Sequence, residues 1–520
     1  MKSLKNFIMV IAVLAMLPLM SVAQKTEKII CKNEECVLVI LEKLRSQDKA
    51  VVSEAKEQVG ILVNNVRFTG DSDMKNALKN SILMFVEKFS DCEGNEYLFS
   101  VIPMFCNRYD TEDIIQLVDR DEIADAVIRC LGNIPGSQDV IMQYIESHRD
   151  NLEHKAALAY AIGKLNISSM ENELISWLKD ADDTTKIEIY NALLVIRSNE
   201  KTTAIVEKGA KKLNKSKNVD NKIAGMRLLT ALNGENAMPM LYKALKNKDA
   251  RVRREALELI KPYANDEVVK NVVKKCKKGD AVVDALDWLG DIKNDTQMEF
   301  VMKQFSSTNP KAVEAAIRAV FKIDNPEGID MVKSMFGGQY QEVIKESMIS
   351  YEGDYGAVLN DVMRHGNANQ QYAALQILEC RPIMNVNNRV KELLNSANPK
   401  VKDEAFKVLK LVMPMAETQY LMTLLEYCDD KYVEDVQIAI KNATINMPVE
   451  KKDEFASTLK HVKADVMPRY YNVFAYFGTE LCVDKLIDAY QNGAYKFEAK
   501  KALLLVENEQ FQERINNVLK

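Results

Sequence analysis

Apolar residues recur along this chain every three or four positions, within segments that short polar turns separate. Clear examples are residues 151–165, 170–180, 184–197 and 201–213, and the alternation continues to the C-terminus. This period places apolar side chains on one face of a helix, whereas a strand alternates at every second residue. No period-2 stretch competes and no Gly/Ser-rich or Pro-rich linker divides the chain, so the sequence predicts a continuous all-α series of paired helices.

A small residue recurs at one position of the second helix in successive pairs. It is Gly225, Ala256, Ala285, Ala316, Ala374, Ala405 and Ala499. The separations are close to multiples of about 30 residues, a period that is typical of solenoids. A small side chain lets two helix axes approach to the low end of about 8–10 Å. The sequence therefore predicts an α-solenoid (superhelix) of helix–turn–helix repeats of about 30 residues.

A cap residue precedes several of these second helices, as at Asp249, Asn309 and Asn398. Residues 393–405 (LLNSANPKVKDEA) resemble a HEAT repeat of the short, PBS-lyase-like type, and residues 241–256 do so too. The Leu-Gly-x-Ile ending of that family appears as LGNI at 131–134, IGKL at 162–165 and LGDI at 289–292.

The resemblance covers residues 121–520 and weakens at 430–480, where Gln437 or Tyr470 occupies the small position. It implies that the motif-bearing helix of each pair lines a concave inner face, and that the protein is a scaffold or binding protein. The lyase activity in the family name does not carry over, because no residue supports bilin chemistry.

The N-terminus has the pattern of an export signal. Lys2 and Lys5 precede an apolar run at 7–20, and Ser21-Val22-Ala23 predicts cleavage before Gln24. A retained anchor is the alternative, but the run is shorter than the ~20 residues that span a bilayer. We expect a signal peptide at 1–23, an irregular N-terminal capping region at 24–120, the solenoid at 121–520, and no transmembrane segment after cleavage.

The chain has nine cysteines, an odd number that cannot all pair with each other inside one chain. An exported chain meets oxidising conditions, in which cysteines can form disulfides. The close pairs are Cys31/Cys36 and Cys92/Cys106, and a disulfide within each pair stays open. The later cysteines fall singly in apolar helical registers, where a free thiol packs as a small hydrophobe. No Cys/His cluster indicates zinc.

Motifs for catalysis, cofactors and metals are not found in the sequence. The four histidines lack HExxH spacing, and there is no P-loop, GxSxG or GxGxxG pattern. The acidic groups at 71–73 and 180–183 fit helix caps rather than an EF-hand. Aromatic residues at 470–477 have the spacing of a packed core near the C-terminal end, with a peptide- or glycan-binding surface as the alternative. We expect no cofactor, while a catalytic site assembled from several repeats stays open.

Basic residues gather between residues 201 and 280, with 20 Lys and Arg against 9 Asp and Glu, although the chain as a whole carries −5. They surround the turn between the two helices of three successive repeats. Equivalent turns stack side by side, so these residues are expected to form a basic strip along a rim. The strip comprises Lys211, Lys212, Lys215, Lys217, Lys246, Lys248, Arg251, Arg253, Arg254, Lys274, Lys275, Lys277 and Lys278.

Lysine and arginine also favour helix C-termini for dipole reasons, so a merely solvated surface is the plain alternative for this strip. As a site, it would meet an acidic protein, an anionic glycan or lipid headgroups. Export makes nucleic acid an unlikely ligand. The sequence thus predicts an exported, non-catalytic scaffold for a protein partner, periplasmic in a double-membrane bacterium and otherwise secreted. Alternatives are an enzyme (a lyase or hydrolase) and a binder of anionic glycan or lipid.

Overall fold

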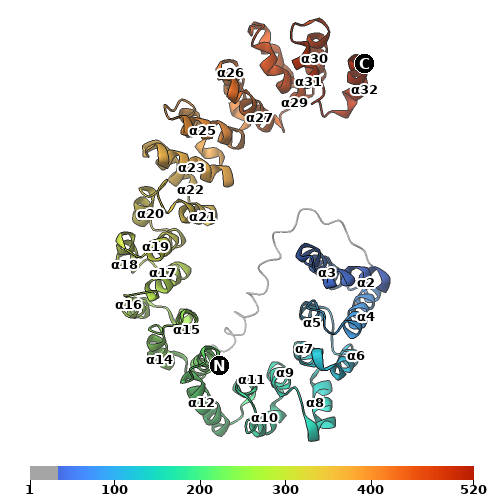
Figure 1. Ribbon diagram of the computed structural model, residues 1–520, viewed down its shortest axis with the longest axis vertical. Coiled ribbons are helices and arrows are strands. Elements are labelled where there is room, and N and C mark those ends of the chain that lie inside the picture. Colours follow the sequence, from blue (N-terminus) through green and yellow to red (C-terminus); the bar gives the residue numbers. More distant parts are fainter. Residues whose placement is uncertain (1–32) are drawn as a thin grey trace. The chain divides into compact units, whose positions relative to one another are not determined.

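The computed structural model describes residues 33–520. Every regular element among them is an α-helix or a short 3-10 helix, and this part of the chain has no strand (Figure 1). The predicted all-α class is confirmed. The expected signal peptide at 1–23 lies outside the described residues. Within 33–520, no helix has both the length and the apolar character that a membrane span requires.

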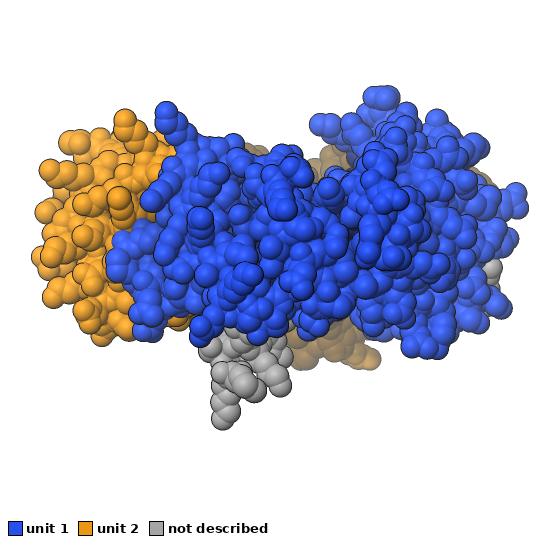
Figure 2. Space-filling model, turned by 90° about the horizontal axis from the view of Figure 1, so that it is seen from below, with its two compact units in different colours: residues 1–241 blue, residues 242–520 orange. Residues whose placement is uncertain are grey.

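The chain divides into two compact units, residues 1–241 and 242–520 (Figure 2). The described helices of unit 1 are α2 (Glu34–Glu42), α3 (Lys49–Thr69), α4 (Ser72–Lys88), α5 (Asn95–Val101), α6 (Thr111–Ile115), α7 (Asp121–Gly132), α8 (Gln138–Ser147), α9 (Lys155–Lys164), α10 (Glu171–Trp177), α11 (Asp183–Ile196), α12 (Glu200–Asn214) and α13 (Val219–Asn233). The boundary expected at residue 120 lies inside this unit, directly before α7.

The division between the units falls within α14 (Met238–Ala244). Unit 2 continues with α15 (Ala250–Ile260), α16 (Asp266–Lys275), α17 (Ala281–Asp291), α18 (Met298–Lys303), α19 (Pro310–Ile323), α20 (Pro326–Lys333), α21 (Gln341–Ser350), α22 (Tyr355–His365), α23 (Ala368–Cys380), α24 (Asn387–Leu393), α25 (Pro399–Val412), α26 (Thr418–Tyr427), α27 (Val433–Thr444), α28 (Val449–Thr458), α29 (Tyr471–Phe477), α30 (Glu480–Asn492), α31 (Lys496–Leu503) and α32 (Gln512–Leu519).

Helices pair as an even-numbered helix followed by an odd-numbered one, and the odd-numbered helices stack on each other. In unit 1 the stacked row runs α5, α7, α9, α11, α13, and in unit 2 it runs from α15 to α31. Figure 1 shows α16, α18 and α20 along one side of unit 2 and α15, α17 and α21 along the other. The predicted solenoid of helical pairs is therefore confirmed within each unit.

The recurring small residues lie where helices approach most closely, and all seven are buried. At Gly225 in α13, an added Cβ would lie 2.4 Å from the Asn214 nitrogen and 2.7 Å from the Ala210 carbonyl oxygen, both in the α12 backbone. Side chains cannot relieve a collision with a helix backbone. The predicted reason for the small residue, close packing of helix axes, is thus seen directly here.

The glycines of the Leu-Gly-x-Ile endings make a second close contact, with the next odd-numbered helix. A Cβ at Gly163 in α9 would lie 2.9 Å from the Cα of Ala192 in α11. The corresponding contacts join Gly132 to Ala161 and Gly290 to Ala319. Each glycine meets an alanine 29 residues later, so the repeat length and the stacking distance are fixed by the same pair.

The pattern has exceptions, and each keeps the position buried in another way. Ser347 in α21 is the buried residue 31 positions after Ala316, and the sequence pattern missed it because only Gly and Ala were sought. Gln437 and Tyr470, which interrupt the pattern, are also buried. The Gln437 amide donates to the Arg469 carbonyl at 2.6 Å, and the Tyr470 hydroxyl donates to the Met422 carbonyl at 2.7 Å.

The predicted helix caps form. Asp249 accepts from the Arg251 amide at 2.8 Å, Asn309 and Asn398 make the equivalent bonds, and Asp182 accepts from Thr185 at 2.7 Å. These bonds satisfy donors that the first helical turn leaves free. They fix where each second helix begins and so define the preceding turn.

The cysteines are mostly buried thiols. Cys36 is disulfide-bonded, whereas Cys31 lies outside the described residues. The other seven cysteines are free, so the second open pairing, Cys92 with Cys106, does not form. Burial raises the pKa of Cys106 to about 12, which keeps this thiol protonated. Cys380, at the end of α23, is exposed, contrary to the expected buried register.

The close approach at Gly225 is tested by adding one methyl group. Gly225→Ala is expected to lower the free energy of unfolding by about 1–3 kcal/mol, because the new Cβ overpacks against the α12 backbone. Gly60→Ala in α3 is the matched control, since its Cβ would meet only the Tyr97 hydroxyl at 3.6 Å. The control should gain stability from helix propensity, by about 1 kcal/mol. Equal melting temperatures for the two variants would contradict the assigned crossing.

Candidate functional site

The residues of the predicted basic strip lie, as expected, at the turns between paired helices. Lys211 and Lys212 lie in the last turn of α12 in unit 1, Lys215 and Lys217 lie in the α12–α13 turn, and all four are exposed. The other nine lie in unit 2, at the α14–α15 turn (Lys246, Lys248), in the first turns of α15 (Arg251, Arg253, Arg254), at the end of α16 (Lys274, Lys275) and in the α16–α17 turn (Lys277, Lys278). The structure therefore brings the second and third groups into one unit, and a strip through all three groups remains a prediction.

Two adjacent turns of unit 2 enclose a cavity of about 600 Å³, which we name the basic cleft. Six exposed lysines line it, and they are Lys246, Lys248, Lys274, Lys275, Lys277 and Lys278. No described residue forms an ion pair with any of the six. Asp280 is the one acidic residue of the lining. The basic cleft is thus a concentration of uncompensated positive charge.

Arg253 corrects one part of the prediction, because its side chain faces inward. It is 5% exposed, and its Nε donates to Asp284 Oδ2 at 2.6 Å. Its Nη1 donates to the carbonyl oxygens of Asn247 and Lys248, each at 2.9 Å. Arg254 Nε approaches the second oxygen of Asp284 at 3.0 Å. Arg253 therefore fixes the lysine-bearing turn to the next repeat and does not present its charge to solvent.

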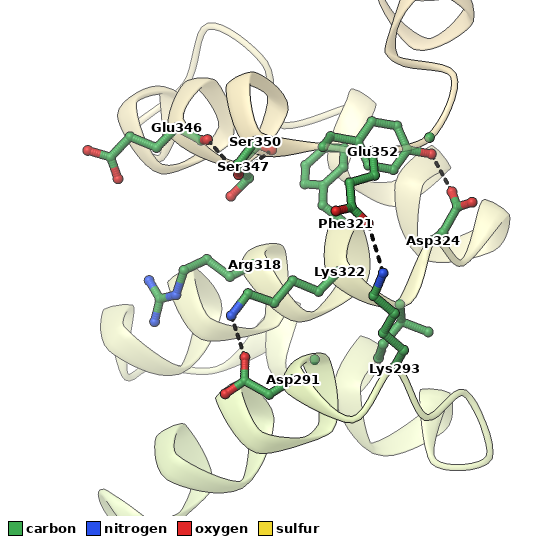
Figure 3. A pocket seen from close by; sticks show the side chains of 14 residues that line it. Asp291, Lys293, Arg318, Phe321, Lys322, Asp324, Glu346, Ser347, Ser350 and Glu352 are labelled. Carbon is green, nitrogen blue, oxygen red and sulfur yellow. Dashed lines mark hydrogen bonds and ion pairs between the residues drawn. The ribbon is translucent and has the colours of Figure 1, made fainter. Parts of the chain in front are cut away.

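A second cavity of about 650 Å³ lies at the C-terminal ends of α17, α19 and α21 (Figure 3). Its charges neutralise each other across repeats. Lys322 pairs with Asp291 at 2.6 Å, and Lys293 pairs with Glu352 at 2.8 Å. Arg318, which also lines it, pairs with Asp287 of α17 at 3.0 Å. This cavity therefore offers little free charge to a ligand, in contrast to the basic cleft.

The floor of the second cavity is aromatic. The rings of Phe321 and Tyr351 lie 5.3 Å apart, edge to face, and the Tyr351 hydroxyl donates to Asp324. Burial and the Asp324 carboxylate raise the pKa of this phenol, so it stays protonated. Sequence reasoning missed this cavity because its residues come from three repeats. The sequence did contain one signal of this cavity, namely residues of opposite charge 31 positions apart, such as Asp291 and Lys322.

Glu404 is the described carboxyl group that most resembles a catalytic acid. Its side chain in α25 is buried, and desolvation raises its pKa, with Lys407 opposing this effect and Glu379 adding to it. Raised carboxyl pKa values are common in active sites. Glu404, however, lines neither of the two cavities, and Lys407 Nζ lies 3.1 Å from it. Its environment is that of a buried structural ion pair.

A group that could offer metal ligands comes from Asp121, Glu153 and His154. One ligand atom from each lies within 4.8 Å of the others, and His154 Nδ1 lies 2.8 Å from Asp125 Oδ1. The sequence shows no HExxH spacing for this histidine, and the group arises because the fold brings the start of α7 to the turn before α9. The two carboxylates of the group are exposed, and such groups are common without an ion.

Breaking the buried ion pair tests its role under the cleft. Asp284→Ala is expected to lower the free energy of unfolding by about 3–5 kcal/mol, because it leaves the Arg253 guanidinium buried and unpaired. Arg253→Met combined with Asp284→Leu removes both charges and should recover most of that loss. Denaturant unfolding followed by circular dichroism measures both variants. An unaltered transition for Asp284→Ala would show that Arg253 reaches solvent.

Adjacent residues of α25 should respond to pH in opposite directions. The folded-state pKa of Glu404 is raised, so its favourable contribution exists in acid and is lost as pH rises through that pKa. Glu404→Gln should therefore be more stable than the parent at pH 7, with the difference vanishing near pH 4. Lys431, followed by Tyr432, lowers the pKa of Asp403, so Asp403→Asn should destabilise at pH 7 and converge in acid. Melting temperatures between pH 2 and 8 measure both effects, and shifts of the same sign at pH 7 would contradict these environments.

Comparison with known proteins gives matches among solved structures alone, since no family model and no curated protein matches the sequence. The chain is similar to UNC-45 from Drosophila melanogaster, with 12% identity over 94% of this chain and 85% of that one, at a TM-score of 0.36. It is also similar to importin beta, with 12% identity, 93% and 79% coverage and a TM-score of 0.32. A chain of a Kap95:Nup1 complex is similar too, with 12% identity over 94% of this chain and 79% of that one, at a TM-score of 0.33. These scores lie below 0.5, so the fold assignment rests on the helices themselves, which form an α-solenoid of stacked helix pairs within each unit.

Proposed function

We propose that this protein is an exported, non-catalytic scaffold that binds a protein partner. The contact surface is the row of odd-numbered helices, which corresponds to the concave face that the HEAT resemblance implies, or the adjoining rim of turns. Each helix pair packs through its apolar residues and the small crossing residue. The polar positions of the odd-numbered helices are thereby left to a partner.

One observation carries this proposal: ion pairs join neighbouring odd-numbered helices across the polar face. Arg318 in α19 pairs with Asp287 in α17 at 3.0 Å, and Lys410 in α25 lies 3.4 Å from Asp435 in α27. Exposed pairs add little stability, about 0–1 kcal/mol each. They do hold side chains in fixed places, and a surface ordered before binding loses less entropy when a partner docks.

The proposal of export rests on the N-terminal sequence, since residues 1–32 lie outside the described range. Cleavage before Gln24 is expected, because small residues occupy positions 21 and 23 after the apolar run. Mass spectrometry of the intact chain from its native host should give a mature protein that begins at Gln24. Changing Ala23 to Arg should block that cleavage. A full-length chain that starts at Met1 in the cytoplasm would contradict export.

Partner binding is tested by cross-linking capture from the native compartment with the mature chain as bait. We expect one or a few proteins to be enriched, with cross-links on the odd-numbered helices or the turns. Hydrogen exchange of the purified complex should show protection on the same residues. Protection confined to even-numbered helices would contradict the proposed face. Capture of no protein, together with turnover of a small substrate, would favour the enzyme alternative and overturn the scaffold.

A further inference from the structure

We propose that the basic cleft of unit 2 binds an acidic peptide segment, rich in Asp or Glu, of a protein partner. The claim that the segment belongs to a protein partner rests on the proposed scaffold function. The claim that the segment is acidic rests on the cleft alone. The lysines of the α14–α15 turn face the lysines of the α16–α17 turn across one cavity. A chain of carboxylates between them would be attracted from both sides.

What sets the cleft apart within the described chain is that six lysines without an ion pair line one cavity, whereas several lysines elsewhere are compensated. Lys322, Lys333, Lys391 and Lys431 each have a carboxylate within 3 Å, supplied mostly by a neighbouring repeat. The six cleft lysines have no such partner. Fields of several like charges around a hollow attract a ligand of opposite charge and raise its association rate. A bound anion would therefore supply the negative charge that no described residue provides to these six lysines.

The lining favours a peptide over a small molecule. Sites for small organic ligands are lined mainly by hydrophobic and aromatic groups. In the basic cleft, Leu245 and Ala281 are the only apolar residues of the lining. The cations are lysines, which act as mobile point charges, while the one arginine of the lining is buried and cannot offer a bidentate fork to phosphate. Several flexible ammonium groups suit a series of carboxylates of variable spacing.

The turns that carry the lysines are held in place before any ligand arrives. Arg253 binds the carbonyl oxygens of Asn247 and Lys248, and Asn247 Oδ1 accepts from the Asp249 amide at 2.9 Å. Asp284 anchors Arg253 to α17 in the following repeat. The two walls of the cleft are thus tied together beneath the lysines. Binding would need to order lysine side chains only, and the backbone of the site is already formed.

The test uses the mature full-length chain and a fluorescent hexaglutamate peptide, with hexaglutamine as the neutral probe. Reversing Lys246, Lys275 and Lys277 to Glu should weaken hexaglutamate binding by about tenfold or more, measured by fluorescence anisotropy. The control reverses Lys303, Lys311 and Lys400, which are exposed and lie outside the cleft, and so changes the net charge equally. It should bind nearly as the parent does. Circular dichroism melting confirms that both variants are folded.

Binding should also weaken steadily with added salt, because exposed charges are screened over about 8 Å at physiological ionic strength. An equal loss of hexaglutamate affinity in the cleft variant and the control variant would overturn the site. Hexaglutamine that binds the parent as tightly as hexaglutamate does would overturn it too. Preference for a heparin oligosaccharide or for phosphatidylglycerol vesicles, with no binding of hexaglutamate, would replace the peptide with another anion and overturn the proposal. Partner capture separates the two hypotheses. Equal capture by parent and cleft variant refutes the cleft alone, whereas capture by neither refutes the scaffold.

Discussion

The close approach of helix backbones at single small residues is the constraint on which this structure depends. At Gly225 the α12 backbone leaves no room for a Cβ, and at Gly163 the neighbouring Ala192 leaves almost none. Helices that pack this closely have one register, because sliding along each other would place larger side chains at the crossing. The length of each repeat follows from that register. The turns of successive repeats then fall side by side within a unit.

The register also decides which charges meet. Side chains about one repeat apart in the sequence become neighbours, and in most of unit 2 they carry opposite signs, as Asp291 and Lys322 do. Between residues 243 and 278 the same geometry brings lysine-rich turns together instead. The only buried compensation there is the Arg253–Asp284 pair, which lies beneath the turns. One structural rule therefore gives a neutral face in some repeats and a positively charged cleft in another.

Much of this could be read from the sequence, because the small residue, the cap and the apolar period are local signals. The capped turns at Asp249 and Asn398 begin helices where the sequence placed them. Contacts that depend on a residue one repeat away could not be read in this way. Arg253 and Arg254 are adjacent and both contact Asp284, yet Arg253 is buried and Arg254 is exposed. Arg253 alone also donates to the carbonyl oxygens of Asn247 and Lys248. Ser347 was missed because a serine can replace alanine at the crossing while its hydroxyl bonds to its own helix.

The central claim is that close packing of successive repeats holds two lysine-bearing turns at one cleft. Cross-linking mass spectrometry of the folded chain with a short amine-reactive reagent measures this directly, without any ligand. The account predicts links between Lys246 or Lys248 and Lys274, Lys275, Lys277 or Lys278, at yields similar to links within each turn. Normal yields within each turn, together with no links between the two turns, would contradict it.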